Sequence, residues 1–460
     1  MCKFDFTTFL LCAFTLSAAQ AQTFTNLAYF NSTNGSGPLG ALVQGVDGNL
    51  YGTTASGGSY SYGTVFKITT SGALTTLHSF CSQANCSDGS DPAAGPVQAT
   101  DGNLYGTTYG GGNGKCGTVF RITLEGALTP LHEFYNTDGC NPDAGVVEAV
   151  GGEFYGTAEF GGTSNCCGAV FKISRGGSLT TLHSFNGVDG FEPLAAVVRA
   201  IDGNFYGTTL AGGPTSNAGT VFRITPEGKL TTIYSFGSTG PTGPDGLIQA
   251  PDGNFYGVSQ YGGAYGGGTV FRLTPAGVLT TLYSFSAVYN GTDLPNNLVQ
   301  GTDGNFYGTT YFGGANGFGT VFKITPGGML TTLHNFDGTN GSRNPGGALV
   351  QATDGNFYGT TFGEGDGPAQ SGTVFKLSVG LGPFVKLLLP SGKVGDAVQI
   401  LGTNLTGADY MSFNGTQASF TVLSPTLIAT TVPIGATSGK VHVNTPGGTL
   451  FSGGPFVVRP

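Results

Sequence analysis

The chain has 460 residues, a formal net charge of −9 and a sequence pI near 4.9. It contains 83 Gly and no Trp, and only 9% of its residues are charged, which is few for an ordinary globular surface. The acidic balance argues against nucleic acid and anionic membranes as partners, and 39% hydrophobic residues are too many for a disordered Gly-rich chain.

The first residues have the pattern of a signal peptide. Lys3 precedes an apolar stretch at 9–14, and an Ala-x-Ala motif follows at 19–21. We therefore expect a signal peptide over residues 1–21 and a mature chain that begins at Gln22 and is secreted or held at the cell surface. No later run reaches the roughly 18 apolar residues that a membrane helix needs, so no membrane span is predicted.

One unit of about 50 residues recurs seven times. The segment Asp-Gly-Asn-Leu-Tyr-Gly around Tyr51 has counterparts around Tyr105, Tyr155, Tyr206, Tyr256, Tyr307 and Tyr358. Each unit predicts four short strands, A to D, which in the first unit are residues 39–44, 49–54, 64–69 and 73–80. Four strands in one such unit is typical of a β-propeller blade, so the pattern predicts a seven-bladed propeller.

The seventh unit lacks its fourth strand. It ends near Ser378, whereas residues 24–30 at the other end of the mature chain roughly match the missing pattern Leu-Thr-Thr-Leu-His-Ser-Phe. We expect residues 24–30 to pair with residues 373–377, so that an N-terminal strand closes the propeller. Closure would protect sheet edges that otherwise favour aggregation.

These units resemble the extracellular GloVer tandem repeats. The recurring element of that family, Asp-Gly-Asn-Phe-Tyr-Gly-Thr-Thr followed by Gly-Gly and Gly-Thr-Val-Phe-Lys-Ile-Thr, stands almost unbroken at 303–325. The resemblance covers roughly residues 24–378 and implies an extracellular protein, without implying a defined biochemical role. The propeller is expected to span residues 22–380.

A different pattern follows the repeats. Residues 390–405 read Pro-Ser-Gly-Lys-Val-Gly-Asp-Ala-Val-Gln-Ile-Leu-Gly-Thr-Asn-Leu, and Thr-Pro-Gly-Gly stands at 445–448. The alternation of Val398 with Ile400 indicates a strand. This part resembles an IPT/TIG domain, which implies an immunoglobulin-like β-sandwich over residues 383–460 that serves as a spacer or binding module. The whole chain is therefore expected to be all-β.

Six cysteines remain after the predicted signal peptide. They are Cys81, Cys86, Cys116, Cys140, Cys166 and Cys167. In an exported chain we expect disulfides, in which Cys81 or Cys86 meets Cys116 and Cys140 meets Cys166 or Cys167, or in which Cys81 and Cys86 bridge each other. Their spacing does not suit a zinc site, and no metal or other cofactor is predicted.

Two polar positions recur in the units. We expect the Asp of the AB turn, such as Asp47, to cap its turn instead of binding calcium, and to pair with the Lys or Arg of strand C, such as Lys67. The His of strand D, such as His78, is interpreted as an outer packing residue, since Tyr stands at or next to that place in other units.

The BC loops vary most between units and form a rim. Their candidate ligand-binding residues are Tyr109, Glu159, Phe160, Gln260, Tyr261, Tyr311, Phe312 and Phe362. Aromatic rings beside acids and amides suit sugars or peptides, although ordinary loop packing is the alternative interpretation. We therefore expect a non-catalytic binding or scaffold protein for an unknown extracellular ligand, carbohydrate or protein. The alternative is a glycosidase or lyase acting on polysaccharide, with Glu159 and a second carboxylate roughly 5–10 Å away.

A last set lies seven positions before each recurring Tyr, on strand A. It comprises Gln44, Gln98, Glu148, Arg199, Gln249, Gln300 and Gln351. We expect these side chains to form a ring near the central channel. Because an unpaired charge there is costly, Glu148 and Arg199 are predicted to form a salt bridge.

Overall fold

The computed structural model describes residues 22–163, 166–214, 217–286, 297–339, 342–363 and 371–459. The predicted signal peptide, residues 1–21, lies outside the described residues. The described residues form β-strands joined by turns and loops, together with the short 3-10 turn η1, Ala84–Cys86. No helix in these ranges is long and apolar enough to cross a membrane.

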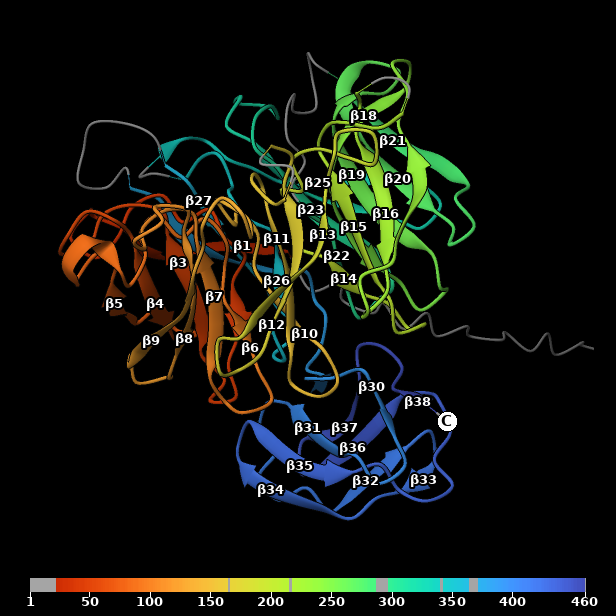
Figure 1. Cartoon of the computed structure of the whole chain (residues 1–460). Helices are drawn as coiled ribbons and strands as arrows, with labels where there is room; N and C mark the ends of the chain where they lie inside the picture. The colour runs from red at the N-terminus through yellow and green to blue at the C-terminus, as the bar shows by residue number, and fades with distance from the viewer. Residues whose placement is uncertain are drawn as a thin grey trace, which may run out of the picture.

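The repeats form seven four-stranded antiparallel sheets (Figure 1). The first three are β2 to β5 (Val43–Gln44, Leu50–Thr54, Thr64–Ile68, Leu74–Ser79), β6 to β9 (Val97–Gln98, Leu104–Thr108, Thr118–Ile122, Leu128–Glu133) and β10 to β13 (Val147–Glu148, Phe154–Ala158, Ala169–Ile173, Leu179–Ser184). The next three are β14 to β17 (Val198–Arg199, Phe205–Thr209, Thr220–Ile224, Leu230–Ser235), β18 to β21 (Pro241–Gln249, Phe255–Gly262, Gly266–Leu273, Leu279–Ser286) and β22 to β25 (Val299–Gln300, Phe306–Thr310, Thr320–Ile324, Leu330–Asn335). The seventh combines β26 (Val350–Gln351), β27 (Phe357–Thr361) and β28 (Thr373–Ser378) with β1 (Thr23–Tyr29).

The recurring Asp holds each AB turn. In the first sheet, Asp47 Oδ1 accepts a hydrogen bond from the Asn49 amide at 3.1 Å, and Oδ2 accepts one from the Tyr51 hydroxyl at 2.8 Å. The predicted capping role is confirmed. The expected ion pair between Asp47 and Lys67 is wrong, since these two described residues do not form one. The Tyr51 hydroxyl donates to Asp47 Oδ2 instead.

The Gly after each recurring Tyr is set by packing. A Cβ on Gly207 would lie 2.5 Å from Cζ of Phe222, whose ring is fully buried on the neighbouring strand β16. Gly52 stands in the same relation to Phe66 at 2.6 Å. The strand B glycine therefore leaves the space that the strand C phenylalanine fills.

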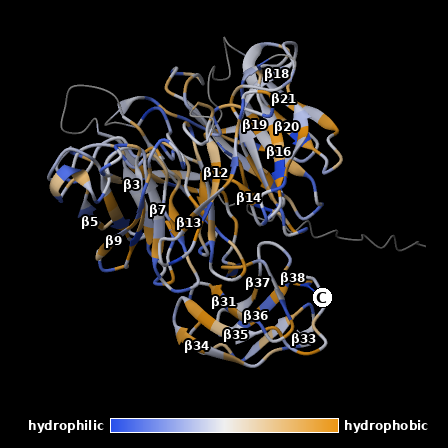
Figure 2. Cartoon of the chain, in the orientation of Figure 1, coloured by the Kyte–Doolittle hydropathy of each residue, from blue (hydrophilic) through white to orange (hydrophobic). Residues whose placement is uncertain are grey.

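Hydrophobic clusters join each sheet to the next. Between the first and second sheets, Phe80 packs edge-on against Phe120 with ring centroids 5.3 Å apart. An equivalent cluster that contains Phe30, Phe66 and Val350 joins the seventh sheet to the first. Figure 2 shows hydrophobic and hydrophilic residues interspersed along the strands.

The two ends of the repeat region share one sheet. Strand β1 pairs antiparallel with β28, from Thr23 opposite Ser378 to Tyr29 opposite Thr373. The Phe24 ring also stacks on His334, with centroids 3.6 Å apart, and so fastens β1 to the sixth sheet. The predicted pairing of the N-terminal strand is confirmed.

A series of hydrogen bonds, here called the polar ladder, joins neighbouring sheets at their AB ends. Strand A side chains accept from backbone amides of the preceding sheet: Gln98 from Val46, Glu148 from Thr100, Gln249 from Ile201, Gln351 from Thr302 and Gln44 from Thr353, at 2.8–3.1 Å. The bond from Thr353 to Gln44 joins the seventh sheet to the first. Two places depart from the rule, because Arg199 has no acceptor atom and Pro251, opposite Gln300, has no amide hydrogen.

Glu148 pairs with Arg175, so the predicted salt bridge with Arg199 is wrong. Glu148 Oε1 lies 2.5 Å from Arg175 Nη2 and also accepts from the Thr100 hydroxyl at 2.7 Å. Arg175 belongs to the turn between β12 and β13, which ends at the same side as the AB turns. Arg199 instead donates from Nη2 to Ser391 Oγ at 2.8 Å.

The C-terminal part has two four-stranded sheets around one core. The first contains β29 (Lys386–Leu387), β31 (Ala397–Leu401), β35 (Leu427–Thr431) and β34 (Phe420–Ser424), the second β33 (Thr416–Gln417), β32 (Tyr410–Phe413), β36 (Val441–Thr445) and β37 (Gly448–Phe451). Strands β30 (Ser391–Lys393) and β38 (Val457–Arg459) pair in parallel beside them. Both sheets contribute to the core, which includes Ile400, Ile428, Met411 and Val443.

This part rests on the AB ends of the repeat sheets (Figure 1). The Thr426 hydroxyl donates to the Val46 carbonyl at 2.7 Å, and the hydroxyls of Thr353 and Thr403 lie 2.8 Å apart. The rim of BC loops is therefore at the opposite end of the sheets and stays uncovered by the C-terminal part.

The six cysteines form three local disulfides. They join Cys81 to Cys86, Cys116 to Cys140, and Cys166 to Cys167. The bridge between Cys81 and Cys86 is the second of the expected alternatives. The expected pairings of Cys116 with Cys81 or Cys86, and of Cys140 with Cys166 or Cys167, are wrong, since Cys116 of the BC loop before β8 meets Cys140 of the DA loop after β9.

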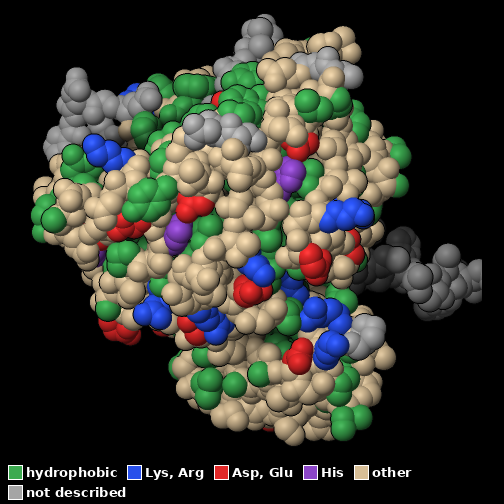
Figure 3. Space-filling view, in the orientation of Figure 1, with side chains coloured by type: hydrophobic (Ala, Val, Ile, Leu, Met, Phe, Trp, Pro, Cys, Tyr) green, Lys and Arg blue, Asp and Glu red, His purple; other side chains and the backbone are tan. Residues whose placement is uncertain are grey.

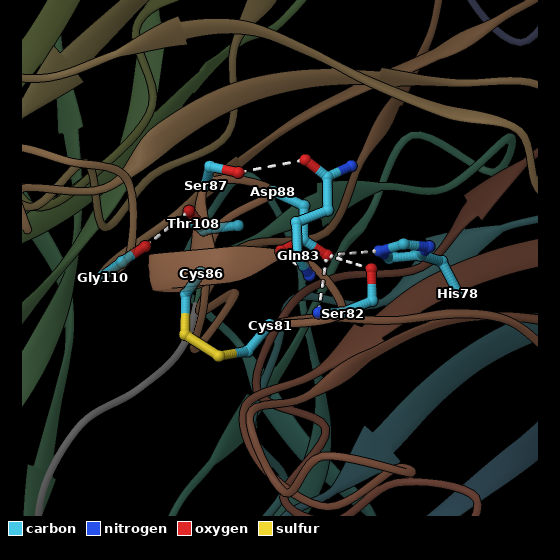
Figure 4. The surroundings of a disulfide bond; sticks show 9 residues. All are labelled: His78, Cys81, Ser82, Gln83, Cys86, Ser87, Asp88, Thr108 and Gly110. Carbon is cyan, nitrogen blue, oxygen red and sulfur yellow. Dashed lines mark hydrogen bonds and ion pairs between the residues drawn. A yellow bond between two sulfur atoms is a disulfide. The ribbon is translucent and has the colours of Figure 1, made fainter.

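The DA loop beside the first bridge is organised by a buried carboxylate (Figure 4). Asp88 Oδ2 accepts from the His78 ring at 3.0 Å and from the Ser82 hydroxyl at 2.7 Å. The same pairing joins His132 to Asp138 and His183 to Asp189. These histidines thus fasten the DA loops as well as packing on strand D.

Candidate functional site

The predicted rim residues follow directly after strand B of their sheets. Tyr109 comes after β7, Glu159 after β11 and Phe362 after β27. Their backbones are held by the neighbouring DA loop, as the Glu159 amide donates to the Asn141 carbonyl at 3.1 Å and the Phe362 amide to the Asn344 carbonyl at 2.8 Å. The rim is therefore a packed layer that joins BC loops to DA loops.

Three side chains of the second and third sheets form an acidic group. The Tyr109 hydroxyl is hydrogen-bonded to the Glu159 carboxylate. The negative charge of Asp143 lies near enough to affect the ionisation of both groups. Burial and the negative charge of Asp143 raise the pKa of Glu159 to about 7. Burial, followed by Glu159, also raises the pKa of the Tyr109 hydroxyl. Near neutral pH, Glu159 can therefore donate a proton as well as accept one.

The acidic group continues into the fifth sheet. Burial and the charge of Asp245 raise the pKa of Asp143 to about 6. Burial also raises the pKa of Asp245, which accepts a weak hydrogen bond from the Gln260 amide at 3.5 Å. Four groups from the third and fifth units, Glu159, Asp143, Asp245 and Gln260, are thus electrostatically linked.

Aromatic residues of the rim follow the acidic group in sequence or form a second group. Tyr261 follows Gln260 on β19 and is 50% exposed. The second group contains Phe312, which is 38% exposed, with Tyr311 at a centroid distance of 4.7 Å and Phe362 at 6.5 Å from Tyr311. Phe160 instead packs towards Phe191, 6.4 Å away. The structure therefore divides the predicted rim into an acidic group and an aromatic group.

Asp143 and Asp245 were missed in the sequence. Both follow the recurring Pro that opens strand A, a place where the other described units carry Leu39, Ala93, Leu194 or Gly346. The appearance of an acid in only two units was the available signal. Among the described residues, no group of three His, Cys, Asp or Glu could hold a metal ion.

Replacing Asp143 with Asn is expected to stabilise the protein in a pH-dependent way. The folded state raises the pKa of this carboxyl from 3.8 to about 6, so it holds the proton more tightly than the unfolded chain does. The free energy of unfolding therefore falls as the pH rises from 3.8 to about 6, and it stays low at higher pH. The Asn variant should gain about 1–3 kcal/mol in free energy of unfolding at about pH 8 and little at about pH 4.

Urea unfolding at the two pH values measures this difference. The matched control is Asp409→Asn, since Asp409 is an exposed acid of the C-terminal part. An equal gain at both pH values, or a loss at about pH 8, would contradict the assignment.

Comparison with known proteins gives a family and a fold. A family model described as the Gloeobacter/Verrucomicrobia repeat matches residues 81–250 and 239–419. No curated protein matches the chain in sequence. A fungal alcohol oxidase of the AA5 family, solved in complex with copper, is 12% identical with a TM-score of 0.51, over 95% of this chain and 99% of that one.

Two further solved structures show similar relationships. The periplasmic gluconolactonase of Pseudomonas aeruginosa is 17% identical with a TM-score of 0.45, over 78% of this chain and 98% of that one. A protein of unknown function from Bacteroides thetaiotaomicron is 14% identical with a TM-score of 0.43, over 78% and 76%. At such identities a likeness concerns the fold alone, which here is nearly all-β with propeller-like neighbours.

Proposed function

The chain belongs to the Gloeobacter/Verrucomicrobia repeat family, and we propose that it is an exported, non-catalytic protein that binds an extracellular carbohydrate or protein through its BC rim. In this proposal the seven sheets are the blades of a closed propeller, residues 22–380, and residues 383–460 are an IPT/TIG immunoglobulin-like domain. The pairing of β1 with β28 and the clusters between successive sheets support the closed arrangement. Three disulfides support export, because such bonds persist in oxidising compartments.

The observation that carries the binding function is the acidic group on the same rim as an exposed tyrosine that follows Gln260. A half-exposed Tyr261 offers a flat surface on which a sugar ring can stack. Glu159, whose pKa is raised to about 7, offers both a hydrogen-bond donor and an acceptor near neutral pH. Carbohydrate hydroxyls need both kinds of partner, so a glycan is the preferred ligand.

A glycan array probed with the mature chain tests this function. One class of glycan should bind, and Tyr261→Ala should weaken its binding by roughly tenfold, as expected for loss of about 1.4 kcal/mol of stacking. The matched control is Tyr29→Ala, because Tyr29 is 44% exposed on the outer strand β1. Equal weakening by both variants, or no glycan bound by the folded chain, would contradict carbohydrate binding at the rim.

A second candidate function is hydrolysis or lysis of a polysaccharide. It is favoured by one observation, the raised pKa values of about 7 for Glu159 and about 6 for Asp143, which suit an acid and a partner carboxylate. Release of reducing ends from array-positive polysaccharides, lost in Glu159→Gln, would favour the enzyme. Binding without release would favour the non-catalytic function.

A further inference from the structure

A cavity lies between the AB ends of the repeat sheets and the C-terminal part. Its volume is about 680 Å³, which falls within the range of small-molecule sites, about 300–1,000 Å³. Strands β14, β22 and β26 supply one wall, and Phe384 and Val457 belong to the other. It is at the opposite end of the sheets from the BC rim, so it is separate from the proposed glycan site.

The charges that line this cavity are all positive. Arg199, Lys386 and Lys440 line it, and no Asp or Glu is among its described lining residues. This is unexpected in a chain with a net charge of −9. Figure 3 shows Lys and Arg side chains gathered along the junction between the two parts.

Arg199 has hydrogen-bonding capacity left over. Its Nη2 donates to Ser391 Oγ at 2.8 Å, whereas its Nη1 is buried and has no hydrogen-bond partner among the described residues. Burial, and then repulsion by Arg459, lowers the pKa of the guanidinium. Glu148 acts in the opposite sense, but its carboxylate already accepts from Thr100 and Arg175.

Lys386 adds a second uncompensated charge. Burial lowers the pKa of its ammonium group, and no described carboxylate lies within 4.0 Å of it. Leaving a partly buried cation unpaired costs free energy that an anion in the cavity would recover. Arg199 and Lys386 come from different parts of the chain, so the pair exists only where the two parts meet.

The regularity of the repeats breaks at this cavity. Five strand A side chains take part in the polar ladder, and the two departures are Arg199 and the junction between Pro251 and Gln300. All three of these residues line the cavity. Residues that give up a bond repeated elsewhere in the fold are candidates for a functional role.

We propose that this cavity binds a small organic anion, whose carboxylate or sulfonate group contacts Arg199 and Lys386. A guanidinium can hold such a group through charge-assisted hydrogen bonds. The apolar body of the ligand packs against Val198, Val299 and Phe384, which line the same space. The C-terminal part thereby completes a ligand site that neither part has alone.

The test uses two fluorescent probes with the mature full-length chain. 1-Anilinonaphthalene-8-sulfonate carries an anionic group, and N-phenyl-1-naphthylamine has the same rings without it. The key variant is Arg199→Gln, which installs the residue that five of the seven units carry and so preserves the fold. We expect it to weaken sulfonate binding roughly 10- to 100-fold, as for loss of a charge-assisted hydrogen bond, and to change binding of the neutral probe by less than about twofold.

Three further variants make the outcome decisive. Lys386→Met keeps the apolar stem and should also weaken the sulfonate selectively. Arg121→Gln makes the same charge change on β8, outside the cavity, and should have little effect. Tyr261→Ala, at the rim, should leave both probes unchanged even if glycan binding is lost. Equal affinity of Arg199→Gln and Arg121→Gln for the sulfonate, or parallel loss of both probes in Arg199→Gln, would overturn the proposal.

Discussion

Deleting residues 22–30 should lower the midpoint of thermal unfolding by about 10 °C or more and make the protein aggregate. The deletion removes the strand that pairs with β28 from Thr373 to Ser378, which leaves a long sheet edge exposed. It also removes Phe30, which is fully buried against Phe66 at a centroid distance of 5.0 Å. Differential scanning calorimetry and size-exclusion chromatography measure the two effects.

Point variants keep this prediction testable if the shortened chain fails to fold. Phe30→Ala should cost about 3–5 kcal/mol, because it opens a cavity between the first and seventh sheets. Tyr29→Ala, next to it but 44% exposed, should cost no more than about 0.5 kcal/mol. A peptide of residues 22–31 added to the shortened chain should raise the midpoint of thermal unfolding part of the way back to that of the full chain. A monomeric shortened chain with an unchanged midpoint would show that β1 does not close the sheets.

Gly207→Ala should destabilise the protein by about 2–3 kcal/mol. The new Cβ would lie 2.5 Å from Cζ of Phe222, whose ring is fully buried in the cluster between the third and fourth sheets. The matched control is Gly382→Ala, since nothing lies within 4 Å of a Cβ at that position. Urea unfolding compares the two variants.

A compensating substitution separates crowding from any other effect of the glycine. Phe222→Leu shortens the side chain that occupies the space, so the double variant with Gly207→Ala should be more stable than the sum of the two single losses predicts. Additive losses would mean that the recurring Gly serves another purpose than making room for Phe222.

The repeat sheets were predictable because the same pattern occurs once in each of seven units. The absence of the Leu-Thr-Thr-Leu-His-Ser-Phe segment after Ser378, with a match at residues 24–30, was sufficient to predict the β1 to β28 pairing. The disulfide pairing was harder to predict, since six cysteines allow 15 pairings and sequence alone cannot choose among them. The choice was made by loop geometry, which brings Cys116 to Cys140.

The candidate site was predicted in part. Variation in the BC loops identified Tyr109 and Glu159, which do contact each other. Asp143 was missed because it lies in a DA loop, and its proximity to Glu159 depends on how adjacent sheets pack. Glu148 was predicted to pair with Arg199, but its partner Arg175 reaches it from a CD turn, which the comparison of strand A positions alone did not include.

The bond between Gln44 and Thr353 has a consequence for the order in which the chain can acquire its structure. The two residues are 309 positions apart, so synthesis at about 5–20 residues per second separates them by roughly 15–60 s. Throughout that interval the first sheet has no seventh sheet to cover Leu50 and Phe66, and β1 has no partner strand. A nascent chain therefore exposes apolar side chains and an unpaired strand until the last unit is made. Chaperones that bind extended apolar segments can bind it throughout this interval.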